Sequence, residues 1–256
     1  MAYLISVVNQ KGGVGKTTTA VNLASCLALK GRFVLLVDLD PQSNATSGLG
    51  IGHRGLERGL YEAIIGQVPV RDITVGTAIE GLKVAPSTAA LAGAAVELVD
   101  VERREYRLAE ALADVRNSYD YIIIDCPPSL GLLTVNGLVA ADRLLIPVQA
   151  EYYALEGLSQ LLRTIDLVRS GLRPELDVMG AVLTMFDSRN RLSNDVLNEL
   201  NRFFPNRIFK AVIPRNIRLA EAPSFGQPIV QYDPWSKGAK AYEQLTQEIL
   251  EMEQNI

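Results

Sequence analysis

Short runs of apolar residues alternate with longer amphipathic stretches along the whole chain. The apolar runs lack polar–apolar alternation, which is typical of strands buried on both faces of a parallel sheet. They predict strands at Tyr3–Val8, Phe33–Asp38, Leu82–Ala85, Tyr121–Asp125, Leu144–Val148, Val178–Thr184 and Ile208–Ile213. The longer stretches predict helices at Thr17–Lys30, Arg104–Ser118, Leu155–Ser170, Ser193–Phe204 and Lys237–Met252. This order indicates a doubly wound α/β fold, with a mostly parallel sheet and helices on both of its faces.

The length of the chain is compatible with one domain. Its 256 residues contain no internal repeat, no low-complexity segment and no linker-like stretch, so we predict a single domain over residues 1–256. The stretch Gly48–Gly81 is the least regular part. We expect it to be a surface excursion, and its pattern gives it no role.

Composition excludes several classes of protein. The single histidine, His53, argues against Ser-His-Asp hydrolases and histidine-rich zinc sites. Two cysteines, Cys26 and Cys126, are too few for a disulfide framework. No apolar run approaches the roughly 18 residues of a membrane span, and the first residues indicate a buried strand rather than a signal peptide. We therefore expect a cytoplasmic protein. Because the formal charge is −4, nucleic-acid binding would need a local basic patch.

A glycine-rich loop follows the first predicted strand and leads directly into a helix. It reads Asn9-Gln10-Lys11-Gly12-Gly13-Val14-Gly15-Lys16-Thr17-Thr18. The N–H groups of such a loop and the following helix N-terminus can surround phosphate oxygens. Lys16 is spaced to reach the β- and γ-phosphates of a nucleotide, and the Thr17 hydroxyl to bind Mg²⁺. The alternative is a glycine-rich turn with a chance Gly-Lys-Thr.

The loop departs from the usual phosphate-loop pattern at two positions. Gln10 stands where the first glycine is expected, and a second lysine, Lys11, follows it. Lys11 would repel Lys16 unless further negative charge is close. A nucleoside triphosphate, such as one held by a second subunit, would supply that charge.

Two other predicted strands end in carboxylates. Asp38 and Asp40 flank Leu39 at the end of one strand, where a carboxylate can hold Mg²⁺ through water or orient the water that attacks a phosphate. Asp125 closes a run of isoleucines, which is the Walker-B arrangement of a magnesium site. Ligands bind at the carboxyl ends of strands in such sheets, so we expect these loops to meet. An Asp-Pro turn that merely closes a strand is the alternative for Asp40.

Three segments together resemble a known family, the deviant-Walker-A partition ATPases of the ParA/Soj type. They are Lys11–Thr17, Asp38-Leu39-Asp40-Pro41-Gln42 and Ile124-Asp125-Cys126-Pro127-Pro128-Ser129. Further agreement lies in Pro147-Val148-Gln149, in Glu151–Gly157 and in Ile213-Pro214-Arg215-Asn216. The likeness covers nearly the whole chain, and it implies a P-loop NTPase fold with ATP and Mg²⁺ as cofactors.

The resemblance also assigns roles to individual residues. It implies that Lys11 reaches across a homodimer to the partner's nucleotide, so that two chains sandwich two ATP molecules. It places the nucleotide on Lys11, Gly12, Gly13, Val14, Gly15, Lys16, Thr17 and Thr18, with looser adenine contacts from Pro214, Arg215 and Asn216. Lys11, Lys16 and Asp40 would be catalytic, and Thr17, Asp40 and Asp125 would serve the metal. Intrinsic ATP hydrolysis would be slow, and a ParB-like centromere-binding partner would stimulate it.

A basic stretch suggests how DNA could be bound. Leu200–Ala220 contains five basic residues and no acidic one; they are Arg202, Arg207, Lys210, Arg215 and Arg218. A solvated face together with nucleotide-loop arginines is the alternative. The resemblance points to Arg189 and Arg218 as contacts to non-specific double-stranded DNA, which would place the protein on the nucleoid. Such binding is led by phosphates and depends strongly on salt.

Related classes share these loops. A MinD-like, membrane-cycling positioning ATPase would need a basic amphipathic helix at the C-terminus, whereas the last predicted helix here ends in acidic residues, so we expect no membrane contact. A cluster-bridging iron protein would need two interfacial cysteines, and Cys26 falls on the apolar side of a helix. A metabolic ATP-dependent ligase or kinase would need a charged substrate pocket of its own. An ATP-dependent DNA-segregation ATPase is therefore the leading hypothesis.

Overall fold

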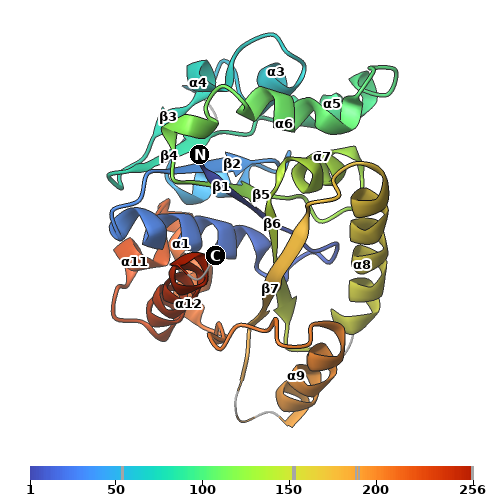
Figure 1. Ribbon diagram of the computed structural model, residues 1–256. Helices are drawn as coiled ribbons and strands as arrows, with labels where there is room; N and C mark the ends of the chain where they lie inside the picture. The colour runs from blue at the N-terminus through green and yellow to red at the C-terminus, as the bar shows by residue number, and fades with distance from the viewer. Residues whose placement is uncertain (53–54, 152–153, 188, 190, 255–256) are drawn as a thin grey trace.

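The computed structural model describes residues 1–52, 55–151, 154–187, 189 and 191–254. Within them a seven-stranded sheet lies between two layers of helices (Figure 1). The strands are β1 (Tyr3–Val7), β2 (Val34–Asp38), β3 (Val75–Gly76), β4 (Leu82–Ala85), β5 (Tyr121–Asp125), β6 (Arg143–Gln149) and β7 (Asp177–Thr184). Their order across the sheet is β3-β4-β2-β5-β1-β6-β7. Only β3 is antiparallel to its neighbour, so the predicted mostly parallel sheet is confirmed.

Helices cover both faces of the sheet, as the sequence predicts. One layer consists of α1 (Lys16–Leu29), α10 (Ile217–Glu221), α11 (Ile229–Tyr232) and α12 (Lys237–Gln254). The other consists of α3 (Leu60–Ile64), α4 (Val70–Ile73), α5 (Leu91–Glu97), α6 (Arg107–Leu112), α7 (Leu132–Ala140), α8 (Ala154–Gly171) and α9 (Arg191–Phe203). The short α2 (Asn44–Gly48) follows β2, and the 3₁₀ turn η4 (Ala222–Phe225) joins α10 to α11.

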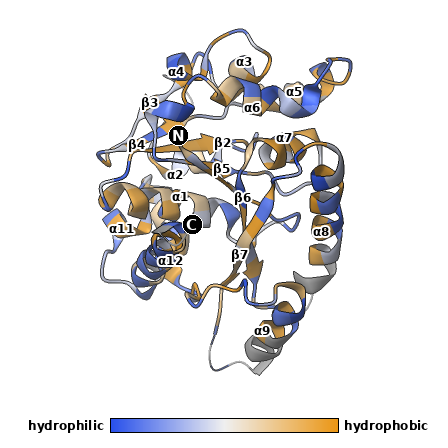
Figure 2. Cartoon of the chain, in the orientation of Figure 1, coloured by the Kyte–Doolittle hydropathy of each residue, from blue (hydrophilic) through white to orange (hydrophobic). Residues whose placement is uncertain are grey.

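Six of the seven strands, all except β3, contribute buried apolar side chains to both layers, which makes the sheet apolar. In β5, Ile122 and Ile124 pack into the α7–α8 layer, whereas Tyr121 and Ile123 pack into the α1–α12 layer. Successive side chains of a strand point to opposite faces, so a strand between two helical layers must be apolar throughout. Figure 2 shows this as a hydrophobic centre with polar residues on the outer surfaces of the helices.

The predicted helix Arg104–Ser118 is wrong as one continuous element. The structure divides it into the 3₁₀ turn η2 (Arg104–Tyr106), α6 and the 3₁₀ turn η3 (Arg116–Ser118). Asn136 of α7 is the physical reason at the first break. Its side chain accepts a hydrogen bond from the Leu108 N–H at 3.0 Å and donates one to the Arg104 carbonyl at 2.9 Å. These backbone groups therefore bond to a neighbouring helix rather than along a single helix.

The predicted strand Ile208–Ile213 is also wrong. The segment makes only isolated bridges, Ala181 with Ile208 and Phe186 with Pro214. Between them, the Lys210 and Ala211 N–H groups donate to the Glu248 carboxylate of α12 at 2.8 and 2.7 Å. A side chain thus takes the amides that a strand ladder would have used.

Other elements were outside the prediction. Helices α5 and α7 received no assignment, and the irregular stretch from Gly48 to Gly81 contains α3, α4 and β3. The last helix, α12, packs against α1 through buried residues that include Tyr242, Leu245 and Ile249. Its apolar side is therefore occupied by the fold.

The strand order brings the predicted site together. β5 lies between β1 and β2, and Asp38 and Asp125 are register partners at the carboxyl ends of β2 and β5. The loops that follow β1, β2 and β5 consequently meet at one edge of the sheet, where ligands bind in this class of fold.

Candidate nucleotide-binding site

The glycine-rich loop runs from the end of β1 to α1, which begins at Lys16. Gly13 and Gly15 adopt φ angles of 75° and 87°, a region that favours glycine. Two side-chain hydrogen bonds fix the loop, one donated by its own Asn9 and one by Thr184. Asn9 donates to the Pro147 carbonyl at 2.8 Å, and Thr184, at the end of β7, donates to the Val14 carbonyl at 2.8 Å. The loop is thus held in place by the ends of β6 and β7.

A cavity of about 360 Å³ opens directly above this loop, a size suited to a small ligand. The loop and α1 contribute Gly12, Gly13, Gly15, Lys16, Thr17 and Thr18. The segment after β2 contributes Asp40, Asn44 and Ser47. The far side comes from α10, η4 and the turn before α11, through Leu219, Ala222, Pro223, Gln227 and Pro228. The cavity therefore joins a phosphate-binding end to an apolar end.

Lys16 is the buried cation of the cavity. The residue is only 6% exposed, and its ammonium donates to the Lys11 carbonyl at 3.0 Å. Burial lowers the pKa of Lys16, while the carboxylates of Asp125 and Asp40 act in the opposite direction. A cation desolvated to this extent is strongly attracted to phosphate oxygens, because little water competes for it.

Asp125 is the buried anion. It is fully buried, and neither carboxylate oxygen has a hydrogen-bond partner among the described residues. Burial and the nearby Asp38 raise the pKa of Asp125 well above its ordinary value; the Thr17 hydroxyl and Lys16 lower it. An unpartnered buried carboxylate is costly unless a ligand completes it.

This arrangement fits a magnesium ion. Carboxylate and hydroxyl oxygens are the ligands that Mg²⁺ prefers, usually one or two from protein, with phosphate and water supplying the rest. Asp125 and Thr17 provide such a pair beside the phosphate loop. The described residues contain no group of three or more His, Cys, Asp or Glu that could hold a metal by itself.

Asp40 lines the cavity, whereas Asp38 does not. Asp40 is 6% exposed, and its Oδ1 accepts a hydrogen bond from the Gln42 N–H at 3.0 Å. Asp38 is fully buried and binds Thr46 of α2 instead. Burial raises the pKa of Asp38 to about 6, although the Thr46 bonds lower it. The two carboxylates therefore face different surroundings, and only Asp40 can meet a ligand in the cavity.

Lys11 belongs to the loop but not to the lining of the cavity. Its side chain is 34% exposed, and its ammonium lies 4.0 Å from Glu151.

Cys126 is unsuited to act as a nucleophile, because burial raises the pKa of its thiol to about 12. It is a packing residue of this edge rather than a nucleophile.

The expected adenine contacts lie beside the cavity and not in its lining. Asn216 caps α10 by accepting a hydrogen bond from the Arg218 N–H at 2.9 Å. Arg215 binds the Phe186 carbonyl through its N–H at 3.2 Å and Glu151 through its guanidinium at 3.4 Å. Adenine contact by Pro214, Arg215 and Asn216 stays a prediction, and the apolar end offered by Leu219 to Pro228 is what the sequence reading missed.

Both candidate DNA-binding arginines are exposed and already paired. The side chain of Arg189 is 87% exposed and makes two bonds to Asp187, at 3.0 and 2.9 Å, which lower the pKa of that carboxyl to about 2. Arg218 is 52% exposed and contacts Glu221 at 3.0 Å and Asp233 at 3.5 Å. DNA contact by Arg189 and Arg218 stays a prediction.

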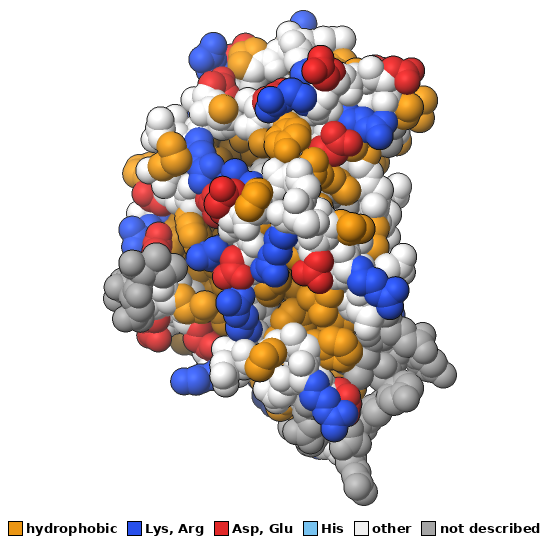
Figure 3. Space-filling view, turned by 45° about the vertical axis from the view of Figure 1, so that its right-hand side comes forward, with side chains coloured by type: hydrophobic (Ala, Val, Ile, Leu, Met, Phe, Trp, Pro, Cys, Tyr) orange, Lys and Arg blue, Asp and Glu red, His pale blue; other side chains and the backbone are white. Residues whose placement is uncertain are grey.

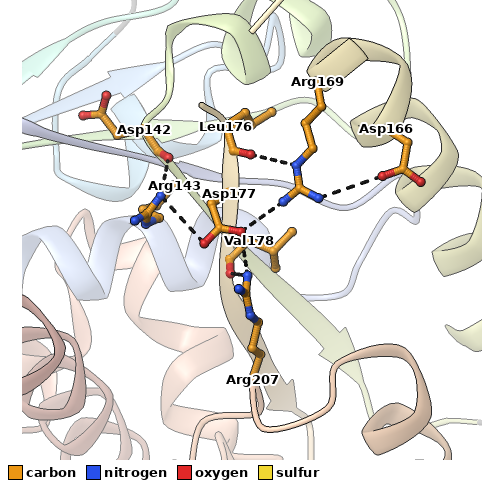
Figure 4. A network of polar contacts seen from close by, with 8 residues as sticks. All are labelled: Asp142, Arg143, Asp166, Arg169, Leu176, Asp177, Val178 and Arg207. Atoms are coloured by element: carbon orange, nitrogen blue, oxygen red, sulfur yellow. Dashed lines mark hydrogen bonds and ion pairs between the residues drawn. The ribbon is translucent and has the colours of Figure 1, made fainter. Parts of the chain in front are cut away.

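The basic stretch 200–220 carries less excess charge than its sequence suggests, because its arginines meet acids from outside it. Arg207 shares Asp177 with Arg143 and Arg169, in the network of Figure 4. Arg202 pairs with Glu199 at 2.8 Å. On the face shown in Figure 3, basic and acidic side chains are interspersed.

No helix in the described ranges has both the length and the apolar character needed to cross a bilayer.

Fold and site together define a class: an α/β P-loop nucleoside triphosphatase. Residues 2–178 match the family described as AAA domain. The chain is 55% identical over 249 residues to the sporulation initiation inhibitor protein Soj of Bacillus subtilis (strain 168), covering 97% of this chain and 98% of that protein. It is 53% identical over 247 residues to the chromosome partitioning protein ParA of Myxococcus xanthus (strain DK1622), covering 96% and 87%.

A solved structure agrees closely. Cobyrinic acid a,c-diamide synthase from Mycobacterium smegmatis, with bound ADP and magnesium, superposes with a TM-score of 0.87 at 39% identity, over 98% of this chain and 94% of that one. The chain belongs to the ParA/Soj family of chromosome-partitioning ATPases, within the AAA-domain proteins.

Proposed function

We propose that this chain is an ATP-dependent DNA-segregation ATPase. ATP and Mg²⁺ are its cofactors, and ATP binding brings two chains together as a sandwich. The dimer holds non-specific double-stranded DNA on the nucleoid, and hydrolysis, stimulated by a ParB-like partner, releases it. Membership of the ParA/Soj family supports the partition role. Site geometry supports the nucleotide switch.

The position of Lys11 is the observation that carries the proposal. The backbone of Lys11 is held at the cavity through the Lys16 ammonium, yet its side chain is outside the lining. The only cavity lysine in the described residues is Lys16. A second loop lysine that leaves its own cavity is suited to the nucleotide of a second chain. One long contact to Glu151, at 4.0 Å, is a weak restraint on it.

Several residues of the site have roles in hydrolysis. Loop N–H groups and Lys16 bind the β- and γ-phosphates. Thr17 and Asp125 would hold Mg²⁺, and a bound Mg²⁺ would supply positive charge beside the phosphates. Asp40 accepts a hydrogen bond from the attacking water and orients it. No arginine lines the cavity among the described residues, so we expect slow intrinsic turnover that depends on Lys11 of the second chain and on the ParB-like partner.

Binding to random-sequence duplex DNA tests the proposal. It is measured with ATP, with ADP and without nucleotide, over a series of salt concentrations. We expect binding only with ATP, weakening as salt rises. Arg189→Ala and Arg218→Ala should each weaken binding and lower the salt slope by about one per lost phosphate contact. Arg71→Ala, an exposed arginine on α4, is the matched control and should bind normally. If the unmodified chain does not bind DNA in any nucleotide state, the proposed DNA role is wrong.

An amide-forming synthase is a second candidate. It is favoured by the likeness to the diamide synthase, at 39% identity. Such an enzyme would use ATP cleavage to form an amide bond between a carboxylate and an amine donor. A chain that ignores DNA in all nucleotide states and hydrolyses ATP only with a carboxylate acceptor present would support this candidate. The higher identity to Soj and ParA ranks it second.

A further inference from the structure

A buried hydrogen-bond relay lies behind Asp40. It starts at Asp38, whose Oδ2 accepts the Thr46 N–H at 2.7 Å and the Thr46 hydroxyl at 2.6 Å. Its other oxygen, Oδ1, accepts the Asp40 N–H at 3.3 Å. The carboxylate of Asp38 therefore closes the loop that runs from β2 to α2 from both ends. Asp40 is inside that loop.

Thr46 extends the relay to another strand. Its hydroxyl is fully buried and also accepts the Ser87 N–H, at 3.1 Å, from the segment that follows β4. One hydroxyl thus donates to Asp38 and accepts from Ser87, so both of its bonding directions are used. A buried group in this position cannot lose one partner without a cost, because no water replaces it.

The loop that the relay closes is under conformational constraint. Ser43, which precedes α2, has a φ of 56°, which is unusual for a residue other than glycine. Such strain persists only where the surroundings hold it, and it is common at functional sites. α2 then presents Asn44 and Ser47 to the cavity beside Asp40. The relay therefore fixes one complete wall of the nucleotide cavity.

The irregular stretch Gly48–Gly81, to which the sequence pattern gives no role, supports the relay from outside through Gly59 and Leu60. The Leu60 N–H at the start of α3 donates to the Pro86 carbonyl at 2.8 Å. A Cβ at Gly59 would lie only 2.8 Å from the Pro86 oxygen and from the Thr88 methyl, so only glycine allows this approach. Segment 86–88 is consequently clamped between α3 and Thr46.

We infer that Asp38 and Thr46 are positioning residues for ATP hydrolysis: they hold the Asp40 carboxylate in place through the hydrogen bonds that Asp38 accepts from Thr46 and from the Asp40 N–H, and through the one that Thr46 accepts from Ser87. Neither side chain lines the cavity, so both act through Asp40. The inference deepens the proposed function, because it rests on Asp40 orienting the attacking water.

The test compares three variants of the full-length chain. Thr46→Val removes the hydroxyl at nearly constant shape, and Thr46→Ser keeps it. Thr88→Val is the matched control, since the Thr88 hydroxyl has no hydrogen-bond partner in the described part of the chain. Steady-state ATP hydrolysis with Mg²⁺ gives kcat and KM, equilibrium binding of a fluorescent ATP analogue gives Kd, and the melting temperature reports folding.

Thr46→Val should lower kcat at least tenfold while Kd and KM change less than about threefold. Thr46→Ser should recover kcat to within about threefold, and Thr88→Val should match the unmodified chain. Equal kcat in Thr46→Val would overturn the inference. So would a parallel fall in kcat and ATP affinity, which indicates a merely structural role. If Thr46→Val fails to fold, Thr46→Ala is judged by the same criteria.

Failure of the proposed function can be distinguished from failure of the positioning role. An unmodified chain that binds ATP without hydrolysing it would contradict the proposed function. An unmodified chain that hydrolyses ATP, beside a fully active Thr46→Val variant, contradicts only the positioning role.

Discussion

At one edge of the sheet Asp125 is fully buried and has no hydrogen-bond partner among the described residues, whereas at the opposite edge two aspartates are surrounded by arginines. Asp142 accepts bonds from Arg116, from Arg173 at 3.1 Å and from the Leu4 N–H at 3.0 Å. Asp177 accepts from Arg169 and Arg207 at 3.1 and 2.6 Å (Figure 4).

The difference separates stability from function. At the amino-terminal edge Asp142 and Asp177 are compensated within the chain, so these two residues stabilise the fold and leave little for a ligand to gain. At the carboxyl-terminal edge Asp125 has no hydrogen-bond partner among the described residues and Lys16 is buried, so their mutual attraction only partly offsets a cost in folding free energy that bound Mg²⁺ and phosphate would relieve. Uncompensated buried charge thus marks the site more sharply than charge density does.

The largest expected effect is at the carboxyl-terminal edge. Lys16→Ala should weaken ATP binding at least 100-fold, because charge-assisted bonds to two phosphates amount to about 3 kcal/mol. Lys83→Ala, an exposed lysine on β4, should bind ATP normally. Isothermal titration calorimetry measures both. Unchanged affinity in Lys16→Ala would contradict the assignment of the phosphate loop.

Asp40→Ala should affect turnover and not binding. We expect hydrolysis to fall about 100-fold, because water is no longer oriented, while ATP still binds. The ATP-bound chain should then stay on DNA longer in a dissociation assay. Normal turnover in this variant would remove Asp40 from the mechanism.

The same change, aspartate to asparagine, should alter the free energy of unfolding in opposite directions at the two edges. Asp142→Asn removes the counter-charge of Arg116 and Arg173, so the free energy of unfolding should fall by about 1–2 kcal/mol. Asp125→Asn removes an unpartnered buried charge, so the ligand-free chain should gain about 1 kcal/mol. Urea denaturation without nucleotide measures both. A loss of stability in Asp125→Asn would mean that its carboxylate is compensated after all.

The smallest effect is a dependence of stability on pH. The pKa of Asp38 is raised from 3.8 to about 6, and that of Asp125 is also raised. Between the unfolded and folded pKa values the folded chain binds more protons, so its unfolding free energy falls as pH rises through about 6. Urea midpoints at about pH 5.5 and 7.5 should show this fall, and Asp125→Asn should reduce it. If stability falls equally between the two pH values in Asp125→Asn and in the unmodified chain, Asp125 does not contribute to the pH dependence.

Local features of the site could be predicted from sequence. The loop residues Gly12 to Thr18 are contiguous, and Asp125 directly follows an apolar run, so spacing alone located them. The supports of the loop, Asn9 and Thr184, could not be predicted, because Thr184 reaches Val14 only after β7 has been placed. The apolar end of the cavity depends in the same way on where α10 and η4 fold.

The errors share a cause, which is a partner distant in sequence. The predicted strand 208–213 is broken by Glu248, and the predicted helix 104–118 by Asn136. Counting charges over 200–220 missed Asp177 and Glu151, which lie outside that stretch. In each case a side chain from another element took a backbone or charged group that local pattern had assigned elsewhere.

The segment after Phe204 also has a consequence for association between molecules. β7 is the long outer strand of the sheet, and an outer strand with free N–H and C=O groups can recruit a strand of another chain. Here Phe209 and Ile213 bond to Ala181 and Leu183 of β7, while Glu248 occupies the amides of Lys210 and Ala211. The covering segment is therefore bonded on both sides without being a strand, and it closes this edge to further strand addition. The backbone of this segment and the Glu248 carboxylate together protect the β7 edge against strand addition.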